Sequence, residues 1–106
     1  MASIDKLEFK GAIGNMPWAS ITMNEFIDAL SKNGWREAPH KGHLYQRLLQ
    51  RGSSLGIKTP NDFARALRSG TTEDAEDGAK KRVCRGGTCW VIFRDNILIT
   101  FRHAKE

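Results

Sequence analysis

Histidine and arginine are the residue types of this 106-residue chain that are best suited to move protons and bind phosphate. Histidine changes protonation near neutral pH, so it is a common general acid or base. Arg47 and Arg51 follow His43 at four-residue intervals, a spacing that aligns side chains on one face of a helix. The pattern predicts a proton-transferring group beside phosphate-binding cations, and a solvated helix face is the alternative interpretation.

A second group of polar residues lies near the end of the chain. Thr100 stands in an apolar run and Arg102 follows two residues later, so both side chains would share one face of a strand. A hydroxyl and a guanidinium together can bind phosphate oxygens. His103 comes next and is a candidate leaving-group acid. An ordinary strand threonine and a tail histidine are the alternatives.

Other kinds of reactive or metal-binding sites are poorly supported. Two cysteines, Cys84 and Cys89, are too few for a disulfide scaffold or a cysteine zinc site. We expect two buried thiols, with a cross-strand disulfide as the alternative in an oxidising environment. Neither a phosphate-binding glycine loop nor a carboxylate cluster for two-metal catalysis is recognisable. We therefore expect no cofactor and no metal.

The charge distribution favours a polyanionic partner. The formal net charge is +5, although four acidic residues fall within the short range 73–77, so the rest of the chain is more basic still. A surface of this kind suits nucleic acid or an acidic protein. We expect no signal peptide and no membrane anchor, because no apolar run is long enough to span a bilayer.

Three helices are expected to position the first group. Thr22 and Glu25 form a capping box ahead of an apolar stripe. A second helix is expected over 42–51, and a third starts after Thr59, where a proline occupies the first helical position, and ends at Gly70.

Strands are expected to position the second group. After a predicted exposed loop over 71–78, the ranges 82–85, 88–94 and 97–102 should form antiparallel strands joined by two-residue turns. The turns fix a register, and the register divides the side chains between two faces. The face expected to carry the helices holds Val83, Trp90, Ile92, Ile99 and Phe101. The face expected to stay open holds Arg82, Cys84, Cys89, Val91, Phe93, Leu98, Thr100 and Arg102.

The order of elements predicts an α+β fold, with N-terminal helices packed on one face of a small twisted antiparallel β-meander. Residues 1–20 are expected to be an entry segment or linker, and 21–106 a single nuclease-like domain. On the open face, Arg82 would bind phosphate beside Thr100 and Arg102. Tyr45 is one of few rings available to stack on an RNA base.

Three runs of residues carry a family resemblance: His43-Leu-Tyr-Gln-Arg-Leu-Leu-Gln-Arg-Gly, Thr59-Pro-Asn-Asp-Phe-Ala-Arg-Ala-Leu-Arg-Ser-Gly and the closing strand Ile-Leu-Ile-Thr-Phe. They resemble the C-terminal ribonuclease toxin domains of contact-dependent growth inhibition proteins, in the barnase/colicin/RelE-like group. The resemblance covers about residues 43–103. It implies helices on a twisted antiparallel sheet and metal-independent cleavage of RNA, often transfer RNA, on the open face.

The same resemblance implies roles and partners. The helix histidine is His43, its cation is one of the two arginines that follow on that helix, and the strand hydroxyl is Thr100, with Arg102 and His103 just beyond it. Our hypothesis is that His43 activates a ribose 2′-hydroxyl to give a 2′,3′-cyclic phosphate. The toxin would be delivered within a larger secreted or cell-surface protein, act in the target-cell cytoplasm and be blocked by an immunity protein, expected to be acidic.

Three alternatives stay open. A basic domain can hold RNA, DNA or an acidic partner without cutting it. A metal-dependent DNase is the second alternative. The third is a HicA-like messenger-RNA interferase, which the segment 23–35 followed by His40 and His43 partly resembles; the helical stripe after His43 argues against it.

Overall fold

Three α-helices precede the main part of the sheet in a computed structural model that describes residues 3–37 and 43–104. They are α1 (Met23–Lys32), α2 (His43–Arg51) and α3 (Pro60–Arg68). The expected caps are confirmed, because Thr22 and Glu25 form a reciprocal capping box and the Thr59 side chain accepts a backbone N–H of α3. Within the described residues, no helix is long and apolar enough to cross a membrane.

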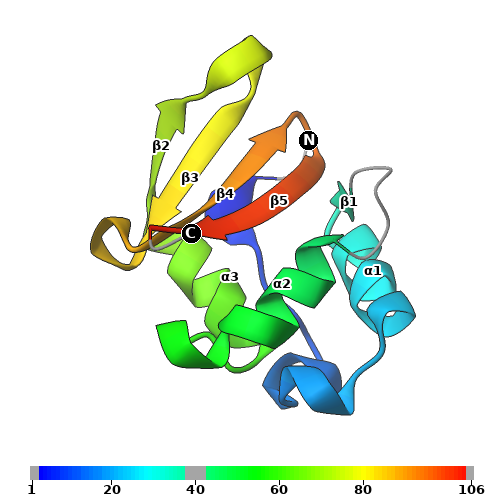
Figure 1. Cartoon of the computed structure of the whole chain (residues 1–106). Helices are drawn as coiled ribbons and strands as arrows, with labels where there is room; N and C mark the ends of the chain where they lie inside the picture. The colour runs from blue at the N-terminus through cyan, green and yellow to red at the C-terminus, as the bar shows by residue number, and fades with distance from the viewer. Residues whose placement is uncertain (1–2, 38–42, 105–106) are drawn as a thin grey trace.

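The sheet has five strands, and the chain is α+β, as predicted. The strands are β1 (Arg36–Glu37), β2 (Thr71–Asp74), β3 (Lys80–Cys84), β4 (Cys89–Arg94) and β5 (Ile97–His103). Their spatial order is β1-β5-β4-β3-β2, with β1 parallel to β5 and the other neighbours antiparallel. Figure 1 shows α2 and α3 against one side of the sheet, while the β2–β3 hairpin projects beyond the helices.

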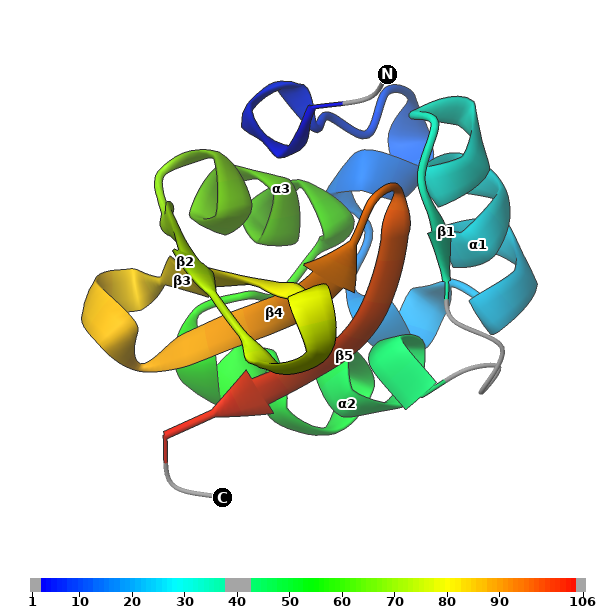
Figure 2. The ribbon, with the colours of Figure 1, turned by 90° about the horizontal axis from the view of Figure 1, so that it is seen from above.

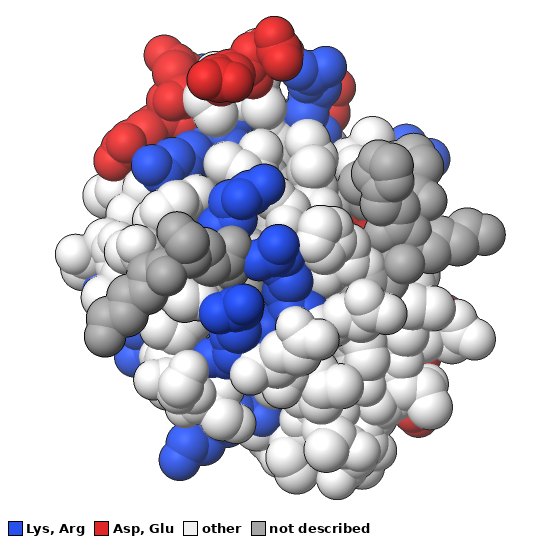
Figure 3. All heavy atoms as spheres, in the orientation of Figure 1, with Lys and Arg blue, Asp and Glu red and all other residues white. Residues whose placement is uncertain are grey.

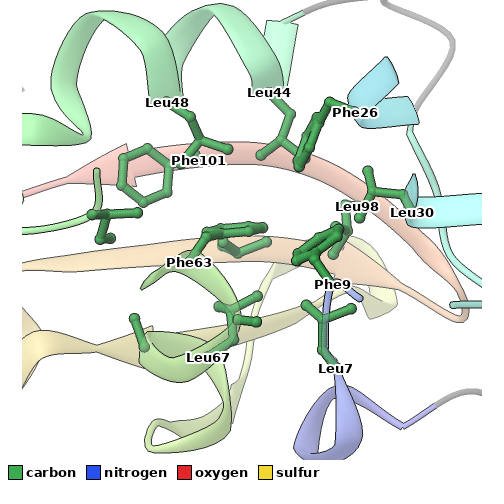
Figure 4. Packing of buried hydrophobic residues seen from close by; sticks show 14 of the residues in the cluster. Leu7, Phe9, Phe26, Leu30, Leu44, Leu48, Phe63, Leu67, Leu98 and Phe101 are labelled. Carbon is green, nitrogen blue, oxygen red and sulfur yellow. The ribbon is translucent and has the colours of Figure 1, made fainter. Parts of the chain in front are cut away.

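The hydrophobic core lies between the helices and this covered side of the sheet (Figure 4). Leu44 and Leu48 of α2 are fully buried, as the apolar stripe predicted, whereas Leu49 of the same stripe is 41% exposed. Phe63 of α3 packs edge-on against Phe101 of β5. Burying such large rings is the main force that holds helices on a sheet.

The N-terminal segment, which was expected to be an entry segment or linker, contributes several buried residues to this core. Leu7, Phe9 and Trp18 are each at most 3% exposed. The segment contains three short 3-10 helices, Ile4–Lys6, Ala12–Asn15 and Trp18–Ser20. The Trp18 indole N–H also donates to the carbonyl of Ile57 at 2.9 Å, which ties the segment to the chain before α3.

The register of the last hairpin differs from the prediction. Arg94 does face Ile97, but the pairing shifts by one residue between Ile92 and Phe93, so that Ile92 faces Thr100 rather than Ile99. The shift is a β-bulge, in which one strand carries an extra residue and alternation is interrupted. Pairs beyond the bulge are therefore displaced by one residue from those expected.

The predicted assignment of the two sheet faces was wrong. The helices cover the side that was expected to stay open, where the buried residues include Arg82, Cys84, Cys89, Val91 and Leu98. Phe101 joins this covered side because the bulge moves it opposite Val91. Trp90 and Ile92, expected under the helices, are half-buried on the other side. The face with the more consistently apolar residues was expected under the helices, but the helices pack on the face that carries smaller and branched residues.

The expected loop over 71–78 is also corrected in part. Residues 71–74 form the edge strand β2, paired along its length with β3, although all four side chains are exposed as predicted. An edge strand needs only backbone pairing on one side, so polar residues do not prevent it. A 3-10 turn follows at Glu76–Gly78.

Arg82 is a structural residue of the covered side and is only 6% exposed, which corrects its expected place on an open phosphate-binding face. Its guanidinium donates to the carbonyls of Leu67 and Arg68 at the end of α3, to the Thr72 hydroxyl and to Asp5. These bonds add a side-chain donor to carbonyls at the end of α3, where the helix itself supplies few; the Leu67 carbonyl also accepts the backbone N–H of Gly70.

We predict that Arg82→Met lowers the free energy of unfolding by about 2–4 kcal/mol, because buried acceptors lose their donor. Asp5→Asn is the matched control; that carboxylate is 65% exposed, so its loss should cost less than about 1 kcal/mol. Denaturant unfolding of both variants gives the measurement. Equal, small losses would show that Arg82 does not hold α3 to the sheet.

Candidate nucleic-acid interface

The first turns of α2 bring His43 and Arg47 together, as their spacing predicted. Arg47 Nε donates to His43 Nε2 at 2.8 Å. Nε2 must therefore carry a lone pair, and a neutral ring in this arrangement has its proton on Nδ1. Both side chains are half-buried, which restricts their motion. The pair places a potential base next to a guanidinium.

The last turn of α2 forms a second pair of the same kind with the end of β5. Arg51 Nη1 lies 2.6 Å from His103 Nε2. A guanidinium can only donate, so His103 Nε2 is the acceptor here as well. At 1.5 Å rise per residue, the start and end of α2 are about 12 Å apart, so the two pairs occupy successive positions along one line.

Further cations continue this line onto the open side of the sheet. Arg102 of β5 lies opposite Trp90 of β4, and Lys81 of β3 places its Nζ 4.4 Å from the centre of the Trp90 ring. We call Arg47, Arg51, Arg102 and Lys81 the cationic row. Figure 3 shows Lys and Arg side chains running down this face, below the acidic tip of the β2–β3 hairpin. Converging cations of this kind attract phosphate groups.

The position of α2 depends on Glu37, a residue that the sequence did not single out. Glu37 is in β1, which pairs with the start of β5, and its Oε1 accepts the backbone N–H of Leu44 at 3.1 Å. A carboxylate at a helix N-terminus satisfies a free N–H and favours the helix dipole. The strand thus fixes the helix turn that carries His43. The acidic residue of a capping box lies within the first turn of its own helix, whereas this carboxylate comes from a separate strand, so no local pattern in the sequence indicates it.

Thr100 is not positioned as a surface phosphate donor. It is 8% exposed, and its Oγ1 is buried with no hydrogen-bond partner among the described residues. The bulge that shifts the register places Thr100 opposite Ile92, in the middle of the sheet. The expected cluster of Arg82, Thr100 and Arg102 is therefore not formed: Arg82 and Arg102 lie on opposite sides of the sheet.

Tyr45 is likewise committed to the fold rather than free to stack on a base. Its hydroxyl donates to the carbonyl of Ile21 at 2.6 Å and lies 3.2 Å from that of Trp18. Its ring packs against Trp18 and Phe26. This correction follows from the N-terminal segment, which covers the side of α2 where Tyr45 lies.

The two cysteines face each other across β3 and β4, as the first turn predicted. Cys84 and Cys89 are free buried thiols with their sulfur atoms 3.2 Å apart. The hydrogen bond with Cys89, together with burial, raises the pKa of the Cys84 thiol. A thiol in that state is a poor nucleophile. The same hydrogen bond lowers the pKa of the Cys89 thiol, but Cys89 is fully buried and so lies away from the surface that carries the cationic row.

Metal ligands are not gathered anywhere in the described parts of the chain: no three His, Cys, Asp or Glu residues there come together in a way that could hold an ion. His40, considered for the interferase alternative, lies outside the described residues.

Comparison with family models, with curated proteins and with solved structures found no match for this chain. The site must therefore be interpreted from its own geometry.

We predict that the cationic row binds single-stranded nucleic acid with a strong salt dependence. Each phosphate contact contributes a slope of about −0.7 to log K against log [salt] for single strands. Arg47→Gln and Arg51→Gln should each make the slope shallower by about that amount, as measured by fluorescence anisotropy.

Lys32→Gln is the matched control, since Lys32 is an exposed cation on α1 that pairs with Asp28. If the slope became shallower by the same amount in all three variants, the protein would attract nucleic acid through its net charge alone.

Proposed function

We propose that this domain is a metal-independent endoribonuclease of the toxin type. The observation that carries the proposal is the pair of histidines on one cationic face, each with Nε2 held by an arginine of α2. Cleavage of RNA by its own 2′-hydroxyl needs a base, an acid and a cation for the phosphoryl oxygens. All three kinds of group are present along this line.

The arginines give each histidine a defined role. A phosphate that enters the row offers oxygens that match a guanidinium better than an imidazole does, because the bond is charge-assisted and can be bidentate. When Arg47 turns to the phosphate, the lone pair of His43 Nε2 is released where a 2′-hydroxyl proton can be accepted. Arg51 and His103 offer the same exchange: once Arg51 turns to the phosphate, His103 Nε2 is open to take a proton from solvent. We assign the resulting imidazolium as the acid that gives this proton to the leaving 5′-oxygen. A 2′,3′-cyclic phosphate would result.

The toxin assignment rests on the resemblance of residues 43–103, and the α+β architecture agrees with what that resemblance implies. Transfer RNA is the substrate it suggests. A cell that makes such an enzyme needs a protective partner, and a cationic row is best covered by an acidic immunity protein. Delivery within a larger secreted or cell-surface protein is part of the same proposal.

A binding module that does not cut RNA is the second candidate. The observation in its favour is that both Nε2 lone pairs already accept hydrogen bonds from arginine. If these bonds persist when RNA binds, neither histidine can take a proton through Nε2, and the row would serve only to hold phosphates.

We predict that the purified domain cleaves total RNA in EDTA, and that His43→Ala lowers the rate by at least about 100-fold, the lower range for a positioned general base. His103→Ala should cause a loss of similar size. Gln46→Ala is the matched control: Gln46 is exposed on the same helix and should be replaceable without effect. Thermal unfolding verifies that each variant is folded.

Three outcomes separate the candidates. Salt-sensitive retention of intact RNA supports the binding module. Activity that EDTA abolishes supports a metal-dependent nuclease. Full activity of His43→Ala would remove this histidine from the mechanism. In bacteria, expression of the wild-type domain should arrest growth and His43→Ala should relieve the arrest, which tests the toxin part of the proposal.

A further inference from the structure

The three tryptophans of the chain differ sharply in exposure. Trp18 and Trp35 are 3% and 2% exposed, within the core. Trp90 is half-buried and belongs to the open side of the sheet, where half-buried Ile92 lies two residues away on the same strand. A large aromatic ring on an uncovered sheet face leaves part of its apolar surface exposed to solvent. Such a ring is a candidate contact for a ligand.

This ring forms part of a pocket of about 470 Å³ beneath the tip of the β2–β3 hairpin. Trp90 and Ile92 supply its apolar side, and Lys81 and Arg102 its cations. The opposite rim comes from Asp74 at the end of β2 and from Ala75 and Glu76, which follow it. Figure 2 looks down on the sheet from the side of this hairpin. The pocket is of a size that holds a small planar group together with its charged substituent.

One cation covers the tryptophan ring and another lies beside it. Lys81 Nζ is over the ring, 4.4 Å from its centre, in a cation–π contact that a stacking base would displace toward the phosphate, and Arg102 is directly opposite Trp90 in the β4–β5 register. An aromatic ring flanked by cations on a groove is the arrangement by which proteins bind single-stranded nucleic acids, with the base stacked on the ring and the phosphate on the cations.

We propose that this pocket binds one unpaired nucleobase of an RNA strand, stacked on Trp90, with its phosphate on Arg102. The inference rests on the proposed function in taking RNA as the ligand, and it adds the class of substrate. From Arg102 the strand continues past His103 to Arg51 and onto α2. The stacked nucleotide would therefore anchor the strand next to the two histidines.

The acidic rim gives the bound nucleotide a direction. Asp74 and Glu76 line the pocket on the hairpin side, and the hydrogen bond and charge of Lys80 lower the pKa of Asp74 and keep it ionised. Carboxylates repel phosphate but accept hydrogen bonds from the N–H groups of a base edge. The base edge should therefore point toward Asp74 and Glu76, and the backbone toward Arg102.

The same geometry excludes duplex RNA from the pocket. Bases within an A-form helix are stacked on one another and paired, and their faces are not available to a side chain. Loops and single-stranded ends expose those faces. We therefore expect the domain to select unpaired segments, such as the loops of a folded RNA.

The test uses tryptophan emission and a ligand that cannot be cleaved by 2′-hydroxyl attack. A short 2′-O-methyl single strand is titrated into the wild-type protein, Trp90→Leu and Trp90→Phe. Stacking should quench part of the wild-type emission, with Trp18 and Trp35 as the unquenched remainder. Loss of a base–aromatic stack of about 1–3 kcal/mol should weaken binding by roughly 5- to 150-fold in Trp90→Leu, and Trp90→Phe should keep most of the affinity.

Two readouts need no variant: quenching of the wild-type emission by the bound strand, and protection of that emission from quenching by iodide. Both remain decisive if Trp90→Leu fails to fold. Absence of both, or equal quenching by a duplex of the same sequence, would overturn the proposal. Unchanged affinity of a folded Trp90→Leu would overturn it too. Binding is measured with the uncleavable strand, and cleavage is measured separately with unmodified RNA. Quenching by the first without cleavage of the second would refute the ribonuclease alone. Cleavage of the second without quenching by the first would refute the pocket alone.

Discussion

The one-residue shift in the β4–β5 pairing determines on which side of the sheet each residue at the end of β5 lies. It moves Phe101 opposite Val91, where it closes the core against Phe63 of α3. Consequently Arg102 is on the open side opposite Trp90, and His103 is opposite Cys89, near the last turn of α2. In a regular hairpin without the bulge, Phe101 would lie on the open side of the sheet and Arg102 on the covered side. Bulges commonly redirect side chains in this way beside functional sites.

The two sides of the sheet consequently differ in role: one packs against the helices, and the other is exposed and carries cations. The covered side is held by apolar packing and by the buried guanidinium of Arg82, which joins α3 to β3. This rigid base lets α2 lie along β5 with one edge exposed, and the cationic row follows that edge onto the open side. The acidic hairpin tip stands above the row and limits where phosphate can settle. Positive and negative surfaces lie close together, and in the proposed mode of binding this arrangement would define a path for a strand rather than a general basic patch.

Local patterns in the sequence were sufficient for much of the fold and for half of the site. Helix caps act within a few residues, so Thr22 and Thr59 predicted the starts of α1 and α3, and helical spacing predicted the contact of Arg47 with His43. The bulge depends on how β5 fits the helices, and no turn residue signals it. Nothing near Arg82 or Tyr45 in the sequence shows that they are structural residues, because their partners come from the N-terminal segment and α3. Trp90 was not predicted as a site residue, because the face of the sheet that carries it was expected to lie under the helices.

In the proposed mechanism, two arginine-held histidines direct a 2′-hydroxyl against its own phosphate. The most direct measurement uses an RNA oligonucleotide with one preferred cleavage site and a copy with a single 2′-deoxy substitution at that nucleotide, both in EDTA. We predict that the substitution blocks cleavage at that bond, because the nucleophile is missing, while the unmodified RNA yields a 2′,3′-cyclic phosphate end. Cleavage of the substituted bond at an undiminished rate would contradict the account.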